Sequence, residues 1–155
     1  MLVLLDIDGV MVPASSWKQP EFLADGFPVF SIKATQALNK IITCTKCTIL
    51  LTTSHKTKYS LSDWKNIFEL RGIKLENLKR LPENSLNVNR KEEILDWIKT
   101  SENKENFVIL DDDKSLNGLM NNLKEKLVLT SPLVGLTSEQ ADEAISILNQ
   151  ELILG

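Results

Sequence analysis

The chain has 155 residues and a mass of 17.5 kDa, with 43% hydrophobic and 25% charged side chains. These values predict one soluble globular domain over residues 1–155, with a core that needs no disulfide or structural metal. The formal net charge of −3 argues against a simple basic nucleic-acid binder, and no apolar run approaches the length of a membrane span. The start of the chain does not resemble a signal peptide, so the expected location is the cytoplasm.

Short apolar runs alternate with amphipathic stretches along the chain. The apolar runs predict buried strands at residues 2–5, 48–51, 78–81, 107–110 and 127–129. The amphipathic stretches predict helices, with expected caps at Ser31, Ser60 or Ser62, Asn89 and Thr137, a further helix from Leu116 to Leu123, and a last helix reaching Leu152. This alternation indicates an α/β fold in which a parallel sheet carries helices on both faces.

Acidic side chains follow two of the predicted strands. Asp6 and Asp8 come directly after the first strand, and Asp111, Asp112 and Asp113 follow the fourth. In sheets of this kind ligands bind at the carboxyl ends of the strands, where such carboxylates repel one another unless a cation lies between them. Either cluster alone is compatible with helix capping, but the two together favour a Mg²⁺ site.

Polar residues also follow the second strand and open the third long helix. Residues 52–55, Thr-Thr-Ser-His, lie where hydroxyl and backbone N–H groups can hold a phosphate, although hydroxyls here also cap helices. Arg90 and Lys91 stand at an expected helix N-terminus, where a cation opposes the helix dipole. Their placement suggests a use outside the helix, such as neutralising a phosphate or a carboxylate.

Taken in order, these segments resemble the four motifs of the haloacid dehalogenase (HAD) superfamily of phosphotransferases. The matching residues are Asp6-Ile7-Asp8-Gly9-Val10 for motif one, Thr53 or Thr52 for motif two, Lys91 or Arg90 for motif three, and Val108-Ile109-Leu110-Asp111-Asp112 for motif four. The resemblance covers essentially the whole chain. It implies a three-layer Rossmann-like core with a mainly parallel sheet.

The resemblance also implies a mechanism, which is a two-step phosphoryl transfer. Asp6 would be the nucleophile that forms an aspartyl-phosphate, and Asp8 would be first the general acid and then the general base. Thr53 would hold the phosphate oxygens, and Lys91 or Arg90 would neutralise their charge. An acid at position 8 favours phosphatase over dehalogenase chemistry.

The implied cofactor is Mg²⁺. It would be held by the Asp6 carboxylate, the Asp8 main-chain carbonyl and Asp112, with Asp111 close by and Asp113 acting through water. In this interpretation the metal lets an anionic carboxylate approach an anionic phosphate. The partner is therefore expected to be a phosphorylated substrate, and no membrane partner is expected.

The intervals between the motifs are too short for the cap domain that gives many HAD enzymes their specificity. A site without a cap is open, which in this family is associated with large substrates such as nucleic-acid ends or phosphoproteins. Residues 9–30, rich in Gly and Pro, predict an irregular excursion that either covers one edge of the sheet or forms a flap beside the site. Its apolar members are Met11, Trp17, Phe22, Phe27 and Phe30, and Trp17 is the candidate for substrate contact.

Charge is unevenly distributed along the chain. Residues 54–91 hold nine basic and four acidic side chains, whereas residues 92–155 hold five and thirteen. The basic segment predicts either a positive rim that attracts anionic substrates or a set of solvated helix faces. Its members include Lys56, Lys58, Arg71, Lys74, Lys79 and Arg80. This asymmetry leaves nucleic acid open as a partner despite the negative net charge.

The residues predict a site for a cation and a phosphate, and the resemblance implies a Mg²⁺-dependent phosphohydrolase of phosphomonoesters. A polynucleotide-end phosphatase and a non-catalytic phosphate-binding module are the alternatives, and the intact motif residues favour an enzyme. Cys44 and Cys47 form a C-x-x-C pair, which raises a redox or metal-binding function. Their ordinary interpretation is two small, partly buried side chains in a loop and at a strand start.

Overall fold

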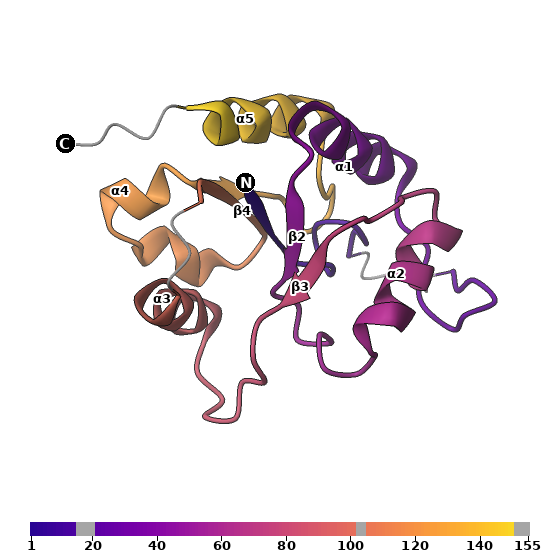
Figure 1. The fold of residues 1–155 in the computed structure, drawn as a ribbon, viewed down its shortest axis with the longest axis horizontal. Coiled ribbons are helices and arrows are strands. Elements are labelled where there is room, and N and C mark those ends of the chain that lie inside the picture. Colours follow the sequence, from indigo (N-terminus) through magenta and orange to yellow (C-terminus); the bar gives the residue numbers. More distant parts are fainter. Residues whose placement is uncertain (15–20, 102–104, 151–155) are drawn as a thin grey trace.

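The computed structural model describes residues 1–14, 21–101 and 105–150, which are built around a five-stranded parallel sheet. The strands lie in the order β3-β2-β1-β4-β5 and are β1 (Leu2–Leu5), β2 (Thr48–Leu51), β3 (Leu78–Arg80), β4 (Phe107–Asp111) and β5 (Leu127–Leu129) (Figure 1). The predicted strands are confirmed, with β3 one residue shorter and β4 one residue longer than expected.

The register of the sheet aligns the ends of its three central strands. Leu5 at the end of β1 pairs with the last residue of β2 and with Leu110 of β4. The next residues along the three segments, Asp6, Thr52 and Asp111, therefore come level at one edge. Because parallel strands all end at the same edge, this is where the polar side chains predicted from the sequence meet.

Helices cover both faces of the sheet, and alternate strand residues divide the core between them. Val3 and Leu5 join one cluster of buried side chains, and Leu2 and Leu4 join the other. The first face carries α1 (Ile32–Thr45), α2 (Leu61–Leu70) and α5 (Ser138–Asn149), and the second carries α3 (Arg90–Thr100), the 3₁₀ helix η1 (Lys114–Gly118) and α4 (Asn121–Lys124) (Figure 1). The predicted three-layer α/β fold is confirmed.

Side-chain caps fix the starts of four helices. Ser31, Ser60, Asn89 and Thr137 each accept a hydrogen bond from the backbone N–H three residues further on. The cap of α2 is thus Ser60 and not Ser62, and Thr137 completes the predicted capping box. The cap at Asn89 matters for function, because it determines where α3 begins at the edge of the sheet.

The single helix predicted from Leu116 to Leu123 is wrong, because the structure divides this stretch into η1 and α4. Leu119 and Met120 between them are extended. Gly118 ends η1 and has low helix propensity, and Leu119 reaches the core from the extended stretch. Burial thus overrides the helical spacing of the apolar residues. The last helix, α5, ends before Leu152, which lies outside the described residues.

In the described parts of the chain, no cap domain is inserted between the motifs. The excursion between β1 and α1 contains only turns and isolated bridges where it is described, and the interval between β2 and α3 contains only α2 and β3. Both of these elements belong to the central fold. Within the described residues, no helix combines the length and hydropathy that crossing a membrane requires.

The excursion before α1 packs mainly into the core. Met11, Phe27 and Phe30 are buried among residues of α1 and α2, which agrees with the interpretation that they cover the sheet. Phe22 differs, because 60% of its surface is exposed. Trp17, the candidate for substrate contact, lies outside the described residues.

Arg71, which follows α2, ties this excursion to the core. Its guanidinium donates to both carboxylate oxygens of Asp25 at 2.7 and 3.0 Å. It also donates to the carbonyl oxygens of Phe27, Pro28 and Ile67, and its side chain is only 2% exposed. These hydrogen bonds hold the pKa of Asp25 below its usual value of 3.8.

Replacing Arg71 with methionine should lower the free energy of unfolding by about 2–4 kcal/mol, because three partly buried carbonyl groups lose a charged donor. Urea denaturation followed by circular dichroism measures this loss, with Lys74→Met, at an exposed lysine nearby, as the matched control. Because the folded-state pKa of Asp25 is lowered, the difference from wild type should shrink as the pH falls below 3.8. Equal unfolding midpoints for Arg71→Met and the wild type would show that the hydrogen bonds of Arg71 do not stabilise the fold.

Candidate active site

Three carboxylates gather at the carboxyl ends of β1 and β4. Asp6 follows β1, Asp111 ends β4, and Asp112 comes next. One oxygen of each lies within 4.8 Å of an oxygen of the others. Asp6 and Asp111 are buried and Asp112 is half-buried. The structure therefore brings together the two acidic segments that the sequence placed at neighbouring strand ends.

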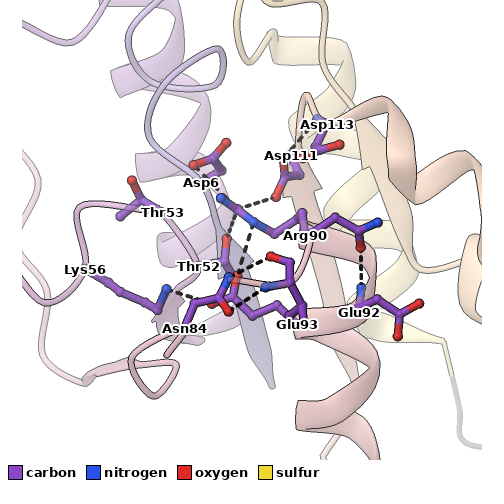
Figure 2. A network of polar contacts seen from close by, with 12 residues as sticks. Asp6, Thr52, Thr53, Lys56, Asn84, Arg90, Glu92, Glu93, Asp111 and Asp113 are labelled. Carbon is purple, nitrogen blue, oxygen red and sulfur yellow. Dashed lines mark hydrogen bonds and ion pairs between the residues drawn. The ribbon is translucent and has the colours of Figure 1, made fainter. Parts of the chain in front are cut away.

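The Arg90 side chain reaches this acidic group from the first residue of α3. Its Nη1 donates to Asp111 Oδ2 at 2.8 Å and to Thr52 Oγ1 at 2.9 Å, and lies 3.6 Å from Asp6 Oδ1 (Figure 2). The side chain is only 12% exposed. A guanidinium with several fixed N–H groups suits a place where carboxylates and a phosphate must be held together.

The charges at this edge do not balance. Burial raises the pKa of Asp6 from 3.8 to about 8, and the charge of Asp111 raises it too, against the lowering effect of Arg90. Burial also raises the pKa of Asp111. For Arg90, burial lowers the pKa, but the charges of Asp111 and Asp6 oppose this and leave it above its usual value. One guanidinium is therefore too little for the buried carboxylates, and an added cation would favour their ionised forms.

The donor set fits Mg²⁺, which prefers a few carboxylates together with waters and a phosphate oxygen. Asp6, Asp111 and Asp112 offer such oxygens. Asp113 is directed elsewhere, because its carboxylate accepts a hydrogen bond from the backbone N–H of Ser115 and thereby caps η1. Its own backbone N–H donates to Asp111 Oδ1 at 3.0 Å, which helps to orient that carboxylate.

Lys91, the other basic candidate for motif three, points away from the acidic group. Its Nζ lies beside Gly118 of η1, 3.3 Å from the place that a Cβ on that glycine would occupy. Arg90 and Lys91 are thus neighbours in sequence on different sides of α3. Of the two, the structure places Arg90 with Asp6 and Asp111.

Thr52 and Thr53 are both buried, but their hydroxyl groups have different partners. Thr52 Oγ1 accepts a hydrogen bond from Arg90, whereas Thr53 Oγ1 accepts the backbone N–H of His55 at 3.3 Å. Thr52 therefore helps to orient the guanidinium. Thr53 lies at the start of the loop after β2, the position expected of the phosphate-binding hydroxyl (Figure 2).

Asp8 lies apart from the three clustered carboxylates. Its Oδ2 is 2.9 Å from Nε2 of His55, and its side chain is 63% exposed. The His55 ring in turn contacts the Phe27 ring edge to face. This exposed placement suits a group that exchanges protons with a substrate or with water, and it leaves the main-chain carbonyl as the predicted link between Asp8 and Mg²⁺.

Sequence reasoning missed a pair of charged residues beside the site, of which one is buried and the other half-buried. Lys56 is only 3% exposed, and its Nζ donates to Glu93 Oε2 at 2.7 Å. Glu93 Oε1 also lies 3.5 Å from Arg90 Nε (Figure 2). The only sequence signal for this group was the i, i+3 spacing of Arg90 and Glu93, because Lys56 comes from a distant segment.

Gly9 packs against the acidic group in a way that no other residue can. Its φ of +81° lies in the left-handed region, and a Cβ there would overlap the carboxylate of Asp112. Its carbonyl oxygen accepts a hydrogen bond from Thr130 Oγ1 at 2.8 Å. The glycine after Asp8 therefore leaves the space in which the Asp112 carboxylate lies.

Replacing Gly9 with alanine should weaken Mg²⁺ binding on the order of 10–100-fold, because the new methyl group displaces Asp112. The rise in melting temperature on adding Mg²⁺ measures this loss without any substrate. Gly26→Ala is the matched control, because Gly26 has a similar φ of +78° and nothing within 4 Å of the added Cβ. An unchanged Mg²⁺ response in Gly9→Ala would contradict the role given to Asp112.

The basic segment does not form the predicted positive rim as a whole. Lys56 pairs with Glu93, Arg71 is held by Asp25, and Arg80 donates to the carbonyl oxygens of Lys56 and Tyr59. These three cations are therefore structural. The exposed members are Lys58, Lys74 and Lys79.

The two cysteines are free thiols. Cys44 on α1 is exposed, and Cys47 just before β2 is buried, which raises the pKa of its thiol. Within the described residues, the group of possible metal ligands consists of Asp6, Asp111 and Asp112 and includes neither cysteine. Cys47, just before β2, agrees with the ordinary interpretation of the pair, whereas Cys44 differs from it, because it is exposed and belongs to the last turn of α1 and not to a loop.

Comparison with known proteins identifies the family. A family model described as the HAD domain in Swiss Army Knife RNA repair proteins matches residues 2–141. No curated protein and no solved structure matches the chain significantly. The matched range contains the five strands and the three clustered carboxylates, and it agrees with the four motifs read from the sequence. The chain therefore belongs to the HAD superfamily, in the family of HAD domains of Swiss Army Knife RNA repair proteins.

Proposed function

We propose that this protein hydrolyses phosphomonoesters with the help of Mg²⁺ and uses Asp6 as its nucleophile. The observation that carries the proposal is the surroundings of Asp6, a buried carboxylate at a strand end. It lies 3.6 Å from the Arg90 guanidinium and next to the carboxylates of Asp111 and Asp112. Membership of the HAD superfamily supports phosphoryl transfer as the chemistry of this site.

In the proposed reaction, an Asp6 oxygen attacks phosphorus, and the bond to the leaving oxygen breaks as Asp8 gives that oxygen a proton. Asp8 then takes a proton from water, whose oxygen attacks the same phosphorus, and the bond to Asp6 breaks to release inorganic phosphate. Arg90 and the Thr53 hydroxyl stabilise the charge on the equatorial oxygens. Asp6, Asp112 and the Asp8 carbonyl would hold Mg²⁺, which would supply further positive charge there.

For the substrate, we propose the phosphorylated end of an RNA chain. The description of the matched family names RNA repair proteins, which supports a polynucleotide end over a small metabolite. The described intervals between the motifs add no domain above the strand ends, so a large substrate has access. The structural roles of Lys56, Arg71 and Arg80 limit the positive surface to a few exposed lysines, which agrees with contact to a chain end and not with wrapping of a long duplex.

A polar cavity of about 460 Å³ adjoins Arg90 and offers room for the part of the substrate beyond the phosphate. Its lining includes Ser54, Asn87, Asn89, Arg90 and Asp113. Hydroxyl and amide groups of this kind form hydrogen bonds with sugar hydroxyls and base edges. The polar lining thus favours a substrate whose leaving group is a nucleotide over one whose leaving group is apolar.

A phosphatase screen tests the proposal. Purified protein should release inorganic phosphate from 3′- or 5′-phosphorylated oligoribonucleotides when Mg²⁺ is present, and EDTA should stop the release. Small phosphorylated metabolites, phosphopeptides and p-nitrophenyl phosphate provide the comparison at equal concentration. Turnover of small metabolites above that of every oligonucleotide would reject the RNA end but keep the hydrolase, whereas no turnover of any substrate would reject the hydrolase itself.

The second candidate is a phosphate-binding module without turnover. The exposed contact between Asp8 and His55 is the observation that favours it, because it occupies the carboxylate that must give up a proton. Binding of a phosphorylated oligonucleotide without any phosphate release in the same screen would support this candidate.

A further inference from the structure

Glu93 connects two cations that lie on opposite sides of it. Its Oε2 accepts a hydrogen bond from Lys56 Nζ at 2.7 Å, and its Oε1 lies 3.5 Å from Arg90 Nε. The carboxylate side chain is only 11% exposed, and that of Lys56 only 4%. Each oxygen of this one carboxylate therefore serves a different cation (Figure 2).

Lys56 is a rigid anchor for this contact. Its backbone N–H donates to the Thr53 carbonyl oxygen at 3.0 Å. Its own carbonyl oxygen accepts hydrogen bonds from Trp64 Nε1 and Arg80 Nη1. The loop that carries Thr53 is thus tied through Lys56 and Glu93 to the start of α3.

The guanidinium of Arg90 is held along two edges. Its Nη1 contacts Asp111 and Thr52, and its Nε faces Glu93. Two contacts on different edges of a planar group fix both its position and its tilt, whereas one contact leaves it free to rotate. Glu93 thereby decides how the remaining N–H groups of Arg90 are presented to the edge of the sheet.

We propose that Glu93 is a positioning residue of the active site, which holds Arg90 in the orientation that stabilises the transferring phosphoryl group. This inference rests on the proposed phosphatase function. It adds a requirement that the four motifs do not contain. Glu93, one helical turn after Arg90, and the buried Lys56, from the loop after β2, together determine the orientation of the Arg90 guanidinium. Glu93 acts on the site through Arg90, which is the residue that contacts Asp111 and lies beside Asp6.

A purely structural role makes a different prediction from a positioning role. Loss of Glu93 leaves the buried Lys56 ammonium without its counter-charge, so both roles predict a less stable protein. Only the positioning role predicts that catalysis stays impaired after stability is restored. Replacing Lys56 together with Glu93 separates the two, because the pair of neutral side chains leaves no unpaired buried charge.

The experiment compares Glu93→Gln, the double variant Lys56→Met/Glu93→Gln, and the control Glu92→Gln, at an exposed acid next to Glu93 on α3. Melting temperature, kcat and KM are measured with a phosphorylated oligoribonucleotide. We expect Glu93→Gln to lower kcat on the order of 10–100-fold with a smaller change in KM. The double variant should regain the melting temperature of the wild type but not its kcat, and Glu92→Gln should match the wild type in all three.

A double-mutant cycle with Arg90 completes the test. If Glu93 acts through Arg90, Glu93→Gln should have little further effect on kcat/KM in the Arg90→Ala background. Two results would overturn the inference and leave the proposed phosphatase function intact. One is recovery of both kcat and melting temperature in Lys56→Met/Glu93→Gln. The other is an equal loss of kcat/KM from Glu93→Gln in the wild-type and Arg90→Ala backgrounds. A wild-type protein without turnover on any phosphomonoester would overturn the proposed function and this inference with it.

Discussion

Replacing Asp6 with asparagine should abolish phosphate release, with a loss in kcat on the order of 10⁴-fold or more. The amide keeps the size of the carboxyl group and can still accept the hydrogen bond from the Ile7 backbone N–H, but it cannot attack phosphorus to form the aspartyl-phosphate. Steady-state release of inorganic phosphate from an oligoribonucleotide and from p-nitrophenyl phosphate measures the effect. Activity within tenfold of wild type would remove Asp6 from its assigned role.

The same variant should not be less stable than the wild type, which separates loss of chemistry from loss of fold. In the folded protein without added metal, the pKa of Asp6 is raised from 3.8 to about 8. The folded state therefore holds a proton on Asp6 that the unfolded state has lost between these values, so the contribution of Asp6 to the free energy of unfolding falls as the pH rises through this range. Asparagine does not titrate and so lacks this contribution. The melting temperature of Asp6→Asn, relative to that of the wild type, should therefore rise as the pH is raised from 4 to 8.

The pair Arg90→Ala and Lys91→Ala should differ sharply in activity. Removing Arg90 deletes the cation that contacts Asp111 and Thr52 and lies beside Asp6, and we expect kcat/KM to fall about 10²–10³-fold. Lys91 faces Gly118 of η1, so its replacement should change kcat/KM by no more than about threefold, the size of an ordinary surface effect. The reverse order of the two effects would assign motif three to Lys91.

Arg90→Lys is the conservative control for this comparison. A lysine keeps the charge but lacks the planar group that can contact Asp111, Thr52 and Glu93 at once. We therefore expect partial activity, between that of Arg90→Ala and that of the wild type. Melting temperatures of the variants with and without Mg²⁺ show whether each still folds and binds the cation.

The sequence alone determined the layout of the fold and the acidic edge of the site. Continuous apolar runs such as residues 2–5 indicate buried strands, and caps such as Asn89 and Thr137 are local signals that the structure confirms. Because parallel strands end at one edge, the alternation of strands and helices is enough to predict that Asp6 and Asp111 meet. These features follow from residues close to one another in the chain and from a topology that their alternation indicates.

The tertiary structure decided what depends on how the elements are rotated and on contacts between distant segments. Arg90 and Lys91 are about 100° apart around α3, so the burial of Ile94 on that helix determines which of them faces the acids. Lys56 gave no sign in the sequence that it is buried, because its partner Glu93 comes 37 residues later. Burying a charged side chain is costly unless an opposite charge and polar surroundings compensate for the lost hydration. Only the assembled fold supplies both.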